Sequence, residues 1–503
     1  MILVFSACGT KPAGGKKPEA SPTSAAAQPT DTLQPSEAAV QITSSTQAPR
    51  VTIRETVVQN MANLVFADQQ PSALLAHIGE HVAASTPQEA DSMVLILESI
   101  QKAWLDYYLD FFDLHADAIP QTSQVWADEL TANGFRLVEV NRHKVPVIDY
   151  SLYRRWEGML SGWFRDYIAI IQAETDLPAV AGGKLAISKE ELERRLLSAS
   201  WYIEQYPVSV RVNQVISLYD SYLYCYLYGY DKDPIINFDS GKISREYYDR
   251  YLEFMKKYPE SKVSSIIAGY ASVIEKGSFK LTEELEKYLV EVFSSLEDQR
   301  VVVRNDIGRQ ILMERMSRLL PEKTGFQWKC IGSGEYQHSA ELVEIHTEDG
   351  NPVYTITGVV GAPSGGGNSD SPAAIELEYR IEGNVLYQIK SAPAMMDSDF
   401  SELEIIRYPF VIGYNWDQYP EDEGINSNSI HTEIISVTQE NGESLFEVEY
   451  TDPFTGQYEK RLLQSGKGTI AFSKLYSDGV NDPFETGYFI DETSTGYPQV
   501  LIP

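Results

Sequence analysis

The sequence predicts a multidomain α and β protein, in which an all-α helical-hairpin domain is followed by an antiparallel β-domain of two related halves. Between residues 51 and 322, apolar side chains recur every three or four positions, the period of amphipathic helices. From about Gly325 the period changes to two, and β-branched and aromatic residues alternate with charged ones, as in half-buried strands. We therefore expect a helical domain over residues 51–322 and an antiparallel β-domain over residues 323–503.

The first 50 residues are expected to lie outside these domains. Met1 to Phe5 are apolar, Ser6 and Ala7 are small, and Cys8 is followed by a long run rich in Pro, Ser, Thr and Ala. A segment with so few large apolar side chains cannot offset the entropy lost on ordering. Residues 9–50 are therefore predicted to be a disordered tether.

This beginning resembles the end of a bacterial lipoprotein signal. In that resemblance Ser6 and Ala7 precede the cleaved bond, and Cys8 is the residue that receives the lipid. Phe5 stands where leucine is usual, and no basic start is present. The resemblance implies an extracytoplasmic protein that is anchored to the cell membrane through a lipid on Cys8. An ordinary N-terminus with a stray cysteine is the alternative.

Charge and cysteine content narrow the classes of function. The formal net charge of −31 argues against sequence-independent binding to nucleic acid, which requires basic surfaces. Only Cys225 and Cys330 remain besides Cys8, too few for a disulfide framework, and we expect both to stay as thiols.

The helical half opens with clear start signals. The sequence Thr86-Pro87-Gln88-Glu89 is a capping box, with proline at the first helical position. Apolar residues then recur in steps of three and four from Met93 to Leu114, which predicts one long helix. A small hairpin is expected over residues 135–150.

Two later units share the same start and stop signals. Ser188 and Ser244 follow isoleucine and precede acidic residues, as helix caps do, and the Tyr206-Pro207 and Tyr258-Pro259 steps then end each helix. This pattern resembles tetratricopeptide-like repeats over about residues 188–300. The resemblance implies a helical-hairpin array that binds a segment of another protein.

The order of features from Thr86 to Lys287 is also similar to that of an uncharacterised group of Gram-positive lipoproteins. That similarity implies a location and no activity.

The β half repeats itself with an offset near 90 residues. Gly325-Phe-Gln-Trp328 corresponds to Gly413-Tyr-Asn-Trp416, and residues 342–354 with their Asp-Gly turn correspond to residues 434–446 with their Asn-Gly turn. We infer two related antiparallel units. The pattern is similar to β-domains of Gram-positive lipoproteins, to which no reaction is attached.

Two short segments of the sequence suggest a possible metal site or ligand-binding site. His77, Glu80 and His81 form an H-x-x-E-H string, the order of an inverted zinc-peptidase motif. No third ligand can be selected, so we expect no zinc site, and a zinc peptidase is kept only as an alternative. A tyrosine-rich stretch could stack on sugars, but tyrosines on a helix more often pack in the core; its members are Tyr219, Tyr222, Tyr224, Tyr226, Tyr228 and Tyr230.

We therefore expect a non-catalytic protein-binding or envelope scaffold module. No catalytic residue, cofactor or metal ligand is assigned, and the partners would be the membrane, through Cys8, and an unknown envelope or secreted protein. A zinc peptidase acting through His77, Glu80 and His81, or a binder of cell-wall glycan, are the alternatives.

Overall fold

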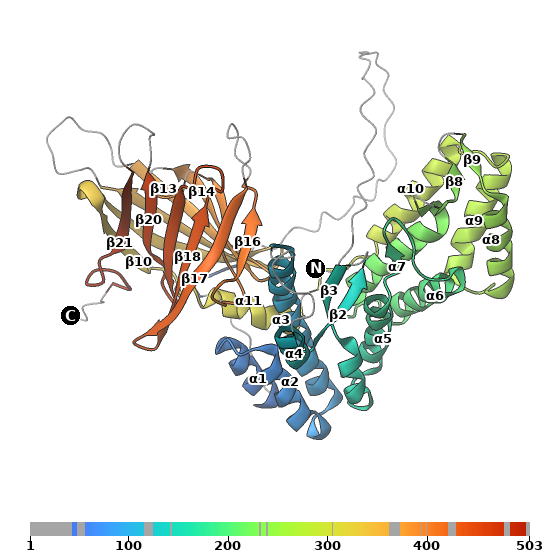
Figure 1. Ribbon diagram of the computed structural model, residues 1–503, viewed down its shortest axis with the longest axis horizontal. Coiled ribbons are helices and arrows are strands. Elements are labelled where there is room, and N and C mark those ends of the chain that lie inside the picture. The colour runs from blue at the N-terminus through green and yellow to red at the C-terminus, as the bar shows by residue number, and fades with distance from the viewer. Residues whose placement is uncertain are drawn as a thin grey trace, which may run out of the picture.

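The computed structural model describes residues 43–47, 56–114, 124–140, 143–230, 233–237, 240–303, 305–361, 373–393, 395–398, 400–420, 429–476 and 483–498. The protein combines a helical part with a large antiparallel sheet, as the sequence predicts (Figure 1). Cys8 and most of the predicted tether lie outside the described residues.

The helical part contains helices that are joined by turns and by short β-hairpins. The helices are α1 (Thr56–Phe66), α2 (Pro71–His81), α3 (Pro87–Leu114), α4 (Gln124–Ala132), α5 (Gly162–Asp176), α6 (Lys189–Gln205), α7 (Val212–Tyr228), α8 (Arg245–Lys257), α9 (Lys262–Lys276), α10 (Glu283–Glu297) and α11 (Ile307–Ser317). The 3-10 helices are η1 (Val82–Ala84) and η2 (Tyr150–Met159), and the short strands are β2 (Phe135–Val140), β3 (His143–Ile148), β4 (Val180–Ala181), β5 (Lys184–Leu185), β6 (Gly229–Tyr230), β7 (Asp233–Pro234), β8 (Ile236–Asn237) and β9 (Lys242–Ile243).

The predicted start of α3 is confirmed. The Oγ1 atom of Thr86 accepts a hydrogen bond from the backbone N–H of Glu89 at 3.3 Å, and the Glu89 carboxylate accepts one from the backbone N–H of Thr86 at 2.7 Å. These reciprocal bonds satisfy N–H groups that a helix start leaves without an intrahelical partner. Strands β2 and β3 form the expected hairpin, which pairs Phe135 with Ile148.

The two Tyr-Pro steps that are predicted to end helices form nearly identical backbone turns. Tyr206 ends α6 with φ −130° and ψ 53°, and Tyr258 ends α8 with φ −129° and ψ 55°. In each turn the serine three residues later donates its backbone N–H to the tyrosine carbonyl, at 3.1 Å from Ser209 and 3.2 Å from Ser261. The caps differ, since Ser188 accepts a bond from Glu191 whereas the Ser244 side chain makes no capping bond.

The sheet has thirteen strands and is nearly closed. Its strands are β1 (Thr43–Ser45), β10 (Gln327–Gly332), β11 (Gln337–Glu348), β12 (Asn351–Val360), β13 (Ala373–Glu382), β14 (Val385–Pro393), β15 (Glu402–Arg407), β16 (Asn415–Gln418), β17 (Ile430–Glu440), β18 (Glu443–Thr451), β19 (Tyr458–Gln464), β20 (Gly468–Tyr476) and β21 (Phe484–Ile490), in the order β15-β14-β13-β12-β11-β10-β21-β20-β19-β18-β17-β16.

The two terminal strands of this order, β15 and β16, are joined by hydrogen bonds from a side chain. The amide of Gln418 on β16 accepts from the backbone N–H of Glu404 on β15 at 2.9 Å and donates to the Glu404 carbonyl at 3.2 Å. The sheet therefore curls into a near-barrel, drawn at the left of Figure 1.

The prediction of two related halves is confirmed. Each half is a meander of six strands, β10 to β15 and β16 to β21, and the first strand of one half pairs with the last strand of the other. Gly325 and Gly413 precede the two first strands with φ of 86° and 83°. Each donates its backbone N–H at 2.8 Å, to Leu342 and to Ile434, where β11 and β17 carry equivalent irregularities of register.

The prediction of disorder through residue 50 is wrong for residues 43–47. Strand β1 pairs with β11 in the register Thr43 to Thr347, and Gln47 forms a bridge with Lys323. The small polar residues cannot form a core of their own. The last residues of β11 extend beyond its pairing with β10, however, and their backbone groups offer partners that require no apolar side chain.

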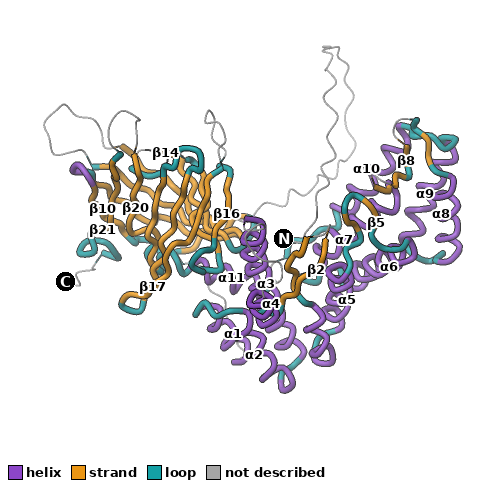
Figure 2. The backbone as a smooth tube through the Cα atoms, viewed as in Figure 1, coloured by secondary structure: helices purple, strands orange, loops and turns teal. Residues whose placement is uncertain are grey.

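Helices α3 and α11 join the near-barrel to the rest of the helical part, as Figures 1 and 2 show. The Tyr107 and Tyr414 rings meet edge to face at 5.1 Å, and Arg407 of β15 pairs with Asp110 of α3 at 3.1 Å. Arg309 of α11 donates to Asn351 of β12 at 2.8 Å. Helices α5 to α10 form an arm that extends away from this junction (Figure 1).

Candidate functional site

A groove of about 370 Å³ lies between α5 and α6 at the base of the arm. Asp166, Ile170 and Ala173 line it from α5, and Arg194, Ser198 and Trp201 line it from α6. Each set is spaced by four and then three residues, so each forms one face of its helix over about 10 Å. We call this hollow the α5–α6 groove.

Trp201 is the most prominent apolar side chain of the groove. It is 48% exposed, and its ring meets the Tyr206 ring edge to face at 5.9 Å. The Tyr206 hydroxyl donates to Asp166 on α5 at 2.8 Å, so the Tyr-Pro turn after α6 also fixes one end of the groove. An exposed tryptophan held by a rigid neighbour is typical of residues that dominate protein interfaces.

The floor of the groove is built from paired charges. Arg195 is buried and bonds to Glu174 of α5 and to Glu191, each at 2.8 Å. Tyr222 of α7 donates to the same Glu174 carboxylate at 2.8 Å. Hydrogen bonds from Arg194 lower the pKa of Glu191 to about 2, so this carboxylate stays ionised at neutral pH. The floor of the groove is therefore a network of charged and hydroxyl groups that bond to one another.

Trp201 is not among the predicted site residues, although its position in the sequence distinguishes it from the buried residues of α6. The buried stripe of α6 includes Leu192, Leu196, Ala199 and Ile203, so Trp201 falls outside it, on the face of Arg194. The helical period alone thus places this large aromatic side chain on the polar face of α6.

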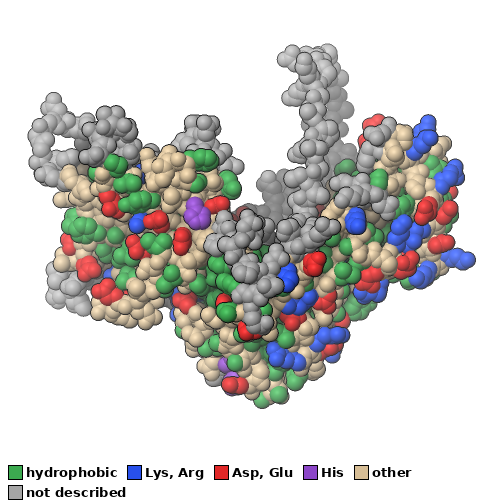
Figure 3. Space-filling view, in the orientation of Figure 1, with side chains coloured by type: hydrophobic (Ala, Val, Ile, Leu, Met, Phe, Trp, Pro, Cys, Tyr) green, Lys and Arg blue, Asp and Glu red, His purple; other side chains and the backbone are tan. Residues whose placement is uncertain are grey.

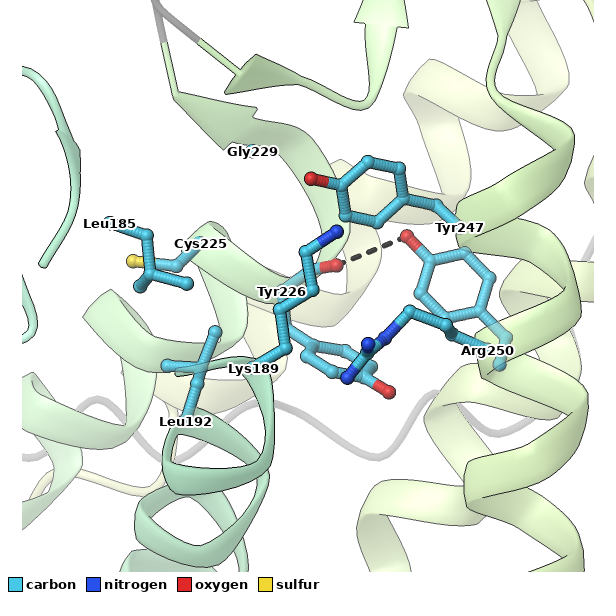
Figure 4. Close-up of a pocket in the computed structure, with 9 residues that line it drawn as sticks. Leu185, Lys189, Leu192, Cys225, Tyr226, Gly229, Tyr247 and Arg250 are labelled. Carbon is cyan, nitrogen blue, oxygen red and sulfur yellow. Dashed lines mark hydrogen bonds between the residues drawn. The ribbon is translucent and has the colours of Figure 1, made fainter. Parts of the chain in front are cut away.

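A smaller hollow lies deeper in the arm, between α6, α7 and α8 (Figure 4). Its volume of about 20 Å³ holds about one water molecule. The Lys189 ammonium covers the Tyr247 ring at 3.9 Å, and the Tyr251 hydroxyl donates to the Tyr226 carbonyl at 3.0 Å (Figure 4). This hollow is a packing feature too small for a metabolite.

The tyrosine-rich stretch of α7 packs mainly into the core, as expected. Tyr219, Tyr222 and Tyr226 are buried, whereas Tyr224 is 48% exposed and stacks on Tyr228 at 4.7 Å. The side chain of Tyr230 lies outside the described residues. The stretch therefore offers few open ring faces for stacking on a sugar.

The H-x-x-E-H string lies on α2, which does not line the groove. The His77 and His81 rings lie 4.5 Å apart, and Nε2 of His77 lies 2.8 Å from the Val57 carbonyl oxygen. The Glu80 side chain is 74% exposed. Among the described residues, no group of three His, Cys, Asp or Glu side chains is arranged to hold a metal ion.

The remaining predicted site residues are cysteines. Cys225 and Cys330 are both buried thiols that are not joined in a disulfide, as expected. Burial raises the pKa of the Cys330 thiol to about 12, which keeps it protonated and unreactive. Cys8 lies outside the described residues.

Charge on the arm is mixed. Figure 3 shows Lys and Arg side chains among Asp and Glu over the outer helices of the arm, with neither sign alone. On the face drawn in Figure 3, the described residues of the arm therefore form no continuous basic stripe of the kind that nucleic acid requires.

Comparisons with known proteins leave the family open. No protein-family model matches the chain, and no curated protein matches it. The chain is similar to the crystal structure of a presumed lipoprotein from Parabacteroides distasonis ATCC 8503, with 13% identity and a TM-score of 0.22, over 35% of this chain and 97% of the other. At that TM-score the match establishes neither fold nor function. Among the described helices, none has the length and apolarity needed to cross a membrane.

Proposed function

We propose that this protein is an extracytoplasmic lipoprotein, anchored through Cys8, that binds a segment of another envelope or secreted protein without catalysing a reaction. The observation that carries the binding role is the α5–α6 groove, with Trp201 exposed along it. The small residues before Cys8 and the composition of the tether support the anchor. The tetratricopeptide likeness supports a helical array as the binding part.

The groove favours a short segment with one or two apolar side chains. Ala173 and Ser198 are small and leave room for an inserted side chain, and Trp201 offers a ring face beside them. Arg194 and Asp166 stand on opposite walls, so a backbone or polar group of the partner can meet either sign. Two turns of helix on each wall match the length of a peptide anchored at i and i+3 or i+4.

Loss of the Trp201 ring is expected to abolish most of the binding. Trp201→Ala removes a large apolar contact at the groove and should weaken capture of the partner by roughly thirtyfold, as for interface hot spots. The partner is first identified by photo-cross-linking, with a benzoylphenylalanine placed at Ser198, and its affinity for purified full-length protein is then measured by calorimetry.

The matched control is Val290→Ala on α10, which truncates an apolar residue that is 64% exposed but lies outside the groove. It should leave the affinity unchanged, and benzoylphenylalanine at residue 290 should not capture the same protein. Equal capture from residues 198 and 290, or equal affinity of the Trp201→Ala protein, would place the binding surface elsewhere.

Membrane attachment is expected to depend on Cys8. When the protein is produced behind a complete lipoprotein signal, Cys8→Ala removes the thiol that receives the lipid and should move the protein from the membrane fraction to the soluble fraction. Cys225→Ala serves as the control, because that thiol is buried in α7. Retention of the Cys8→Ala protein in the membrane fraction after a high-salt wash would contradict the anchor.

A further inference from the structure

The two halves of the near-barrel differ in how one equivalent strand edge is covered. In the first half, β11 extends past its pairing with β10, and β1 pairs with the extension in the register Thr43 to Thr347. The offset that carries the Asp349-Gly350 turn onto the Asn441-Gly442 turn places residues 437–439 of β17 at the position of this extension. We call residues 437–439 the β17 edge.

The β17 edge has no partner on one side among the described residues. Strand β16 pairs only with residues 430–433 of β17, and from residue 436 onward β17 pairs with β18 alone. Thr438 and Gln439 are exposed, and the end of the β17–β18 hairpin projects from the near-barrel in Figure 1. The counterpart of the edge that β1 covers is therefore open.

The backbone groups of the β17 edge point toward its open side. In an antiparallel hairpin with a two-residue turn, the residues that flank the turn form a hydrogen-bonded pair, and such pairs then alternate along the ladder. Glu440 and Glu443 flank the turn here, so Gln439 directs its N–H and C=O groups away from β18. The Ser444 carbonyl, opposite Gln439, accepts from the backbone N–H of Ser465 at 2.9 Å, as this alternation requires. An added strand would bond to these groups.

Two glutamates at the end of the β17 edge have no cationic partner. Glu440 and Glu443 face each other across the ladder, are exposed, and form no ion pair within the described structure. Like charges directly opposite each other disfavour strand pairing. In the first half Asn351 occupies the position of Glu443 and accepts from Arg309 of α11 at 2.8 Å. Arg318 lines a hollow together with Glu443, but its guanidinium is bonded to another glutamate at 2.8 Å.

We propose that the β17 edge binds an extended segment of another protein that carries lysine or arginine at its N-terminal end. The segment would run antiparallel to β17, as β1 runs along β11, so its N-terminal end would approach Glu440 and Glu443. A second copy of this chain fits less well, because it would bring the same two glutamates to the interface. The site is separate from the α5–α6 groove and does not depend on the partner proposed for that groove.

The probe is a fluorescent peptide that carries the sequence of residues 43–47 with two lysines added before it. Its binding to full-length protein is followed by fluorescence anisotropy, and a matched peptide carries two glutamates in place of the lysines. The lysine peptide should bind about fivefold more tightly than the glutamate peptide, because each lysine can pair with an exposed glutamate of the hairpin. Hydrogen exchange of residues 437–439 should become slower when the lysine peptide is bound.

Gln439→Pro removes one N–H group from the β17 edge and should weaken binding of the lysine peptide by about fivefold. Proline is tolerated on an edge strand where its missing N–H would face solvent, and circular dichroism should show that the variant is folded. Gln439→Ala is the matched control, because it keeps the N–H group and should bind the peptide as the wild type does.

Glu440→Gln combined with Glu443→Gln should remove the preference for the lysine peptide. The control is Glu376→Gln combined with Glu378→Gln, which neutralises two carboxylates on one face of β13 and should keep the preference.

The proposal is overturned if the lysine peptide does not bind or if the two peptides bind equally. It is also overturned if slower exchange is confined to residues 345–347, since the peptide would then replace β1 on β11. Sedimentation velocity tests the remaining occupant: a dimer of the full-length protein that Gln439→Pro converts to a monomer would assign the β17 edge to a second copy and overturn the proposal.

Discussion

Replacing Arg211 with methionine should destabilise the protein by about 3 to 5 kcal/mol, the cost of breaking a buried ion pair from one side. Arg211 is 1% exposed and immediately precedes α7. Its Nε donates to Glu98 of α3 at 2.7 Å, and its Nη1 donates to Asp306, the cap of α11. One side chain therefore joins the arm to the two helices that contact the near-barrel.

The Glu98 carboxylate depends on this partner. It is buried, and it also accepts from Tyr150 at 2.8 Å and from the Lys102 ammonium at 3.0 Å. Burial alone would raise the pKa of Glu98, but attraction to Arg211 and Lys102 holds that pKa below its ordinary value of 4.5. Without Arg211, two carboxylates lose their main counter-charge in a region from which water is excluded.

The measurement is urea unfolding at pH 7, followed by circular dichroism. Lys287→Met is the control, because Lys287 and Glu291 form an exposed pair on α10 whose loss should change stability by less than about 0.5 kcal/mol. Glu98→Met combined with Arg211→Met should cost less than the sum of the single changes, because no unpaired Glu98 remains. Additive losses would mean that the two residues act independently.

Local sequence patterns predicted much of the fold. Caps and prolines act within one turn of helix, so α3 starts after Thr86 and α6 ends before Tyr206 as predicted. The repeated Gly-x-x-Trp pattern predicted two related halves because each copy performs the same local task, a positive-φ glycine before a first strand.

Longer-range features could not be read in this way. The added strand β1 depends on an open edge of β11, which no property of Thr43–Ser45 reveals. The α5–α6 groove depends on how two helices separate around Arg195, which no spacing within either helix reveals. The H-x-x-E-H string illustrates the converse, since regular spacing places His77 beside His81 but supplies no third ligand among the described residues.

A buried histidine should make the stability of the near-barrel sensitive to mild acid. His338 of β11 is 6% exposed, its Nδ1 has no hydrogen-bond partner within the described structure, and its ring meets the Tyr488 ring edge to face at 4.7 Å. Burial lowers the pKa of His338 from 6.5 to about 4, and the nearby Asp397 charge only partly opposes this effect. The imidazole is therefore neutral in the folded protein at pH 5.

Because the folded pKa lies below the unfolded value, the unfolded chain binds more protons between pH 6.5 and about 4. The contribution of His338 is thus fully present above pH 6.5 and is lost as the pH falls through that window, by about 3 kcal/mol in total.

His338→Phe keeps an aromatic ring beside Tyr488 and removes the titratable group. The free energy of unfolding of this variant should therefore fall less steeply as the pH is lowered, and the difference in slope should correspond to the uptake of about one proton. Val359→Gln, which alters an exposed residue of β12 that carries no titratable group, should keep the wild-type slope. Urea unfolding of all three proteins at half-unit steps from pH 7 to pH 4 measures these slopes, and parallel curves for wild type and His338→Phe would show that His338 is not the group that titrates.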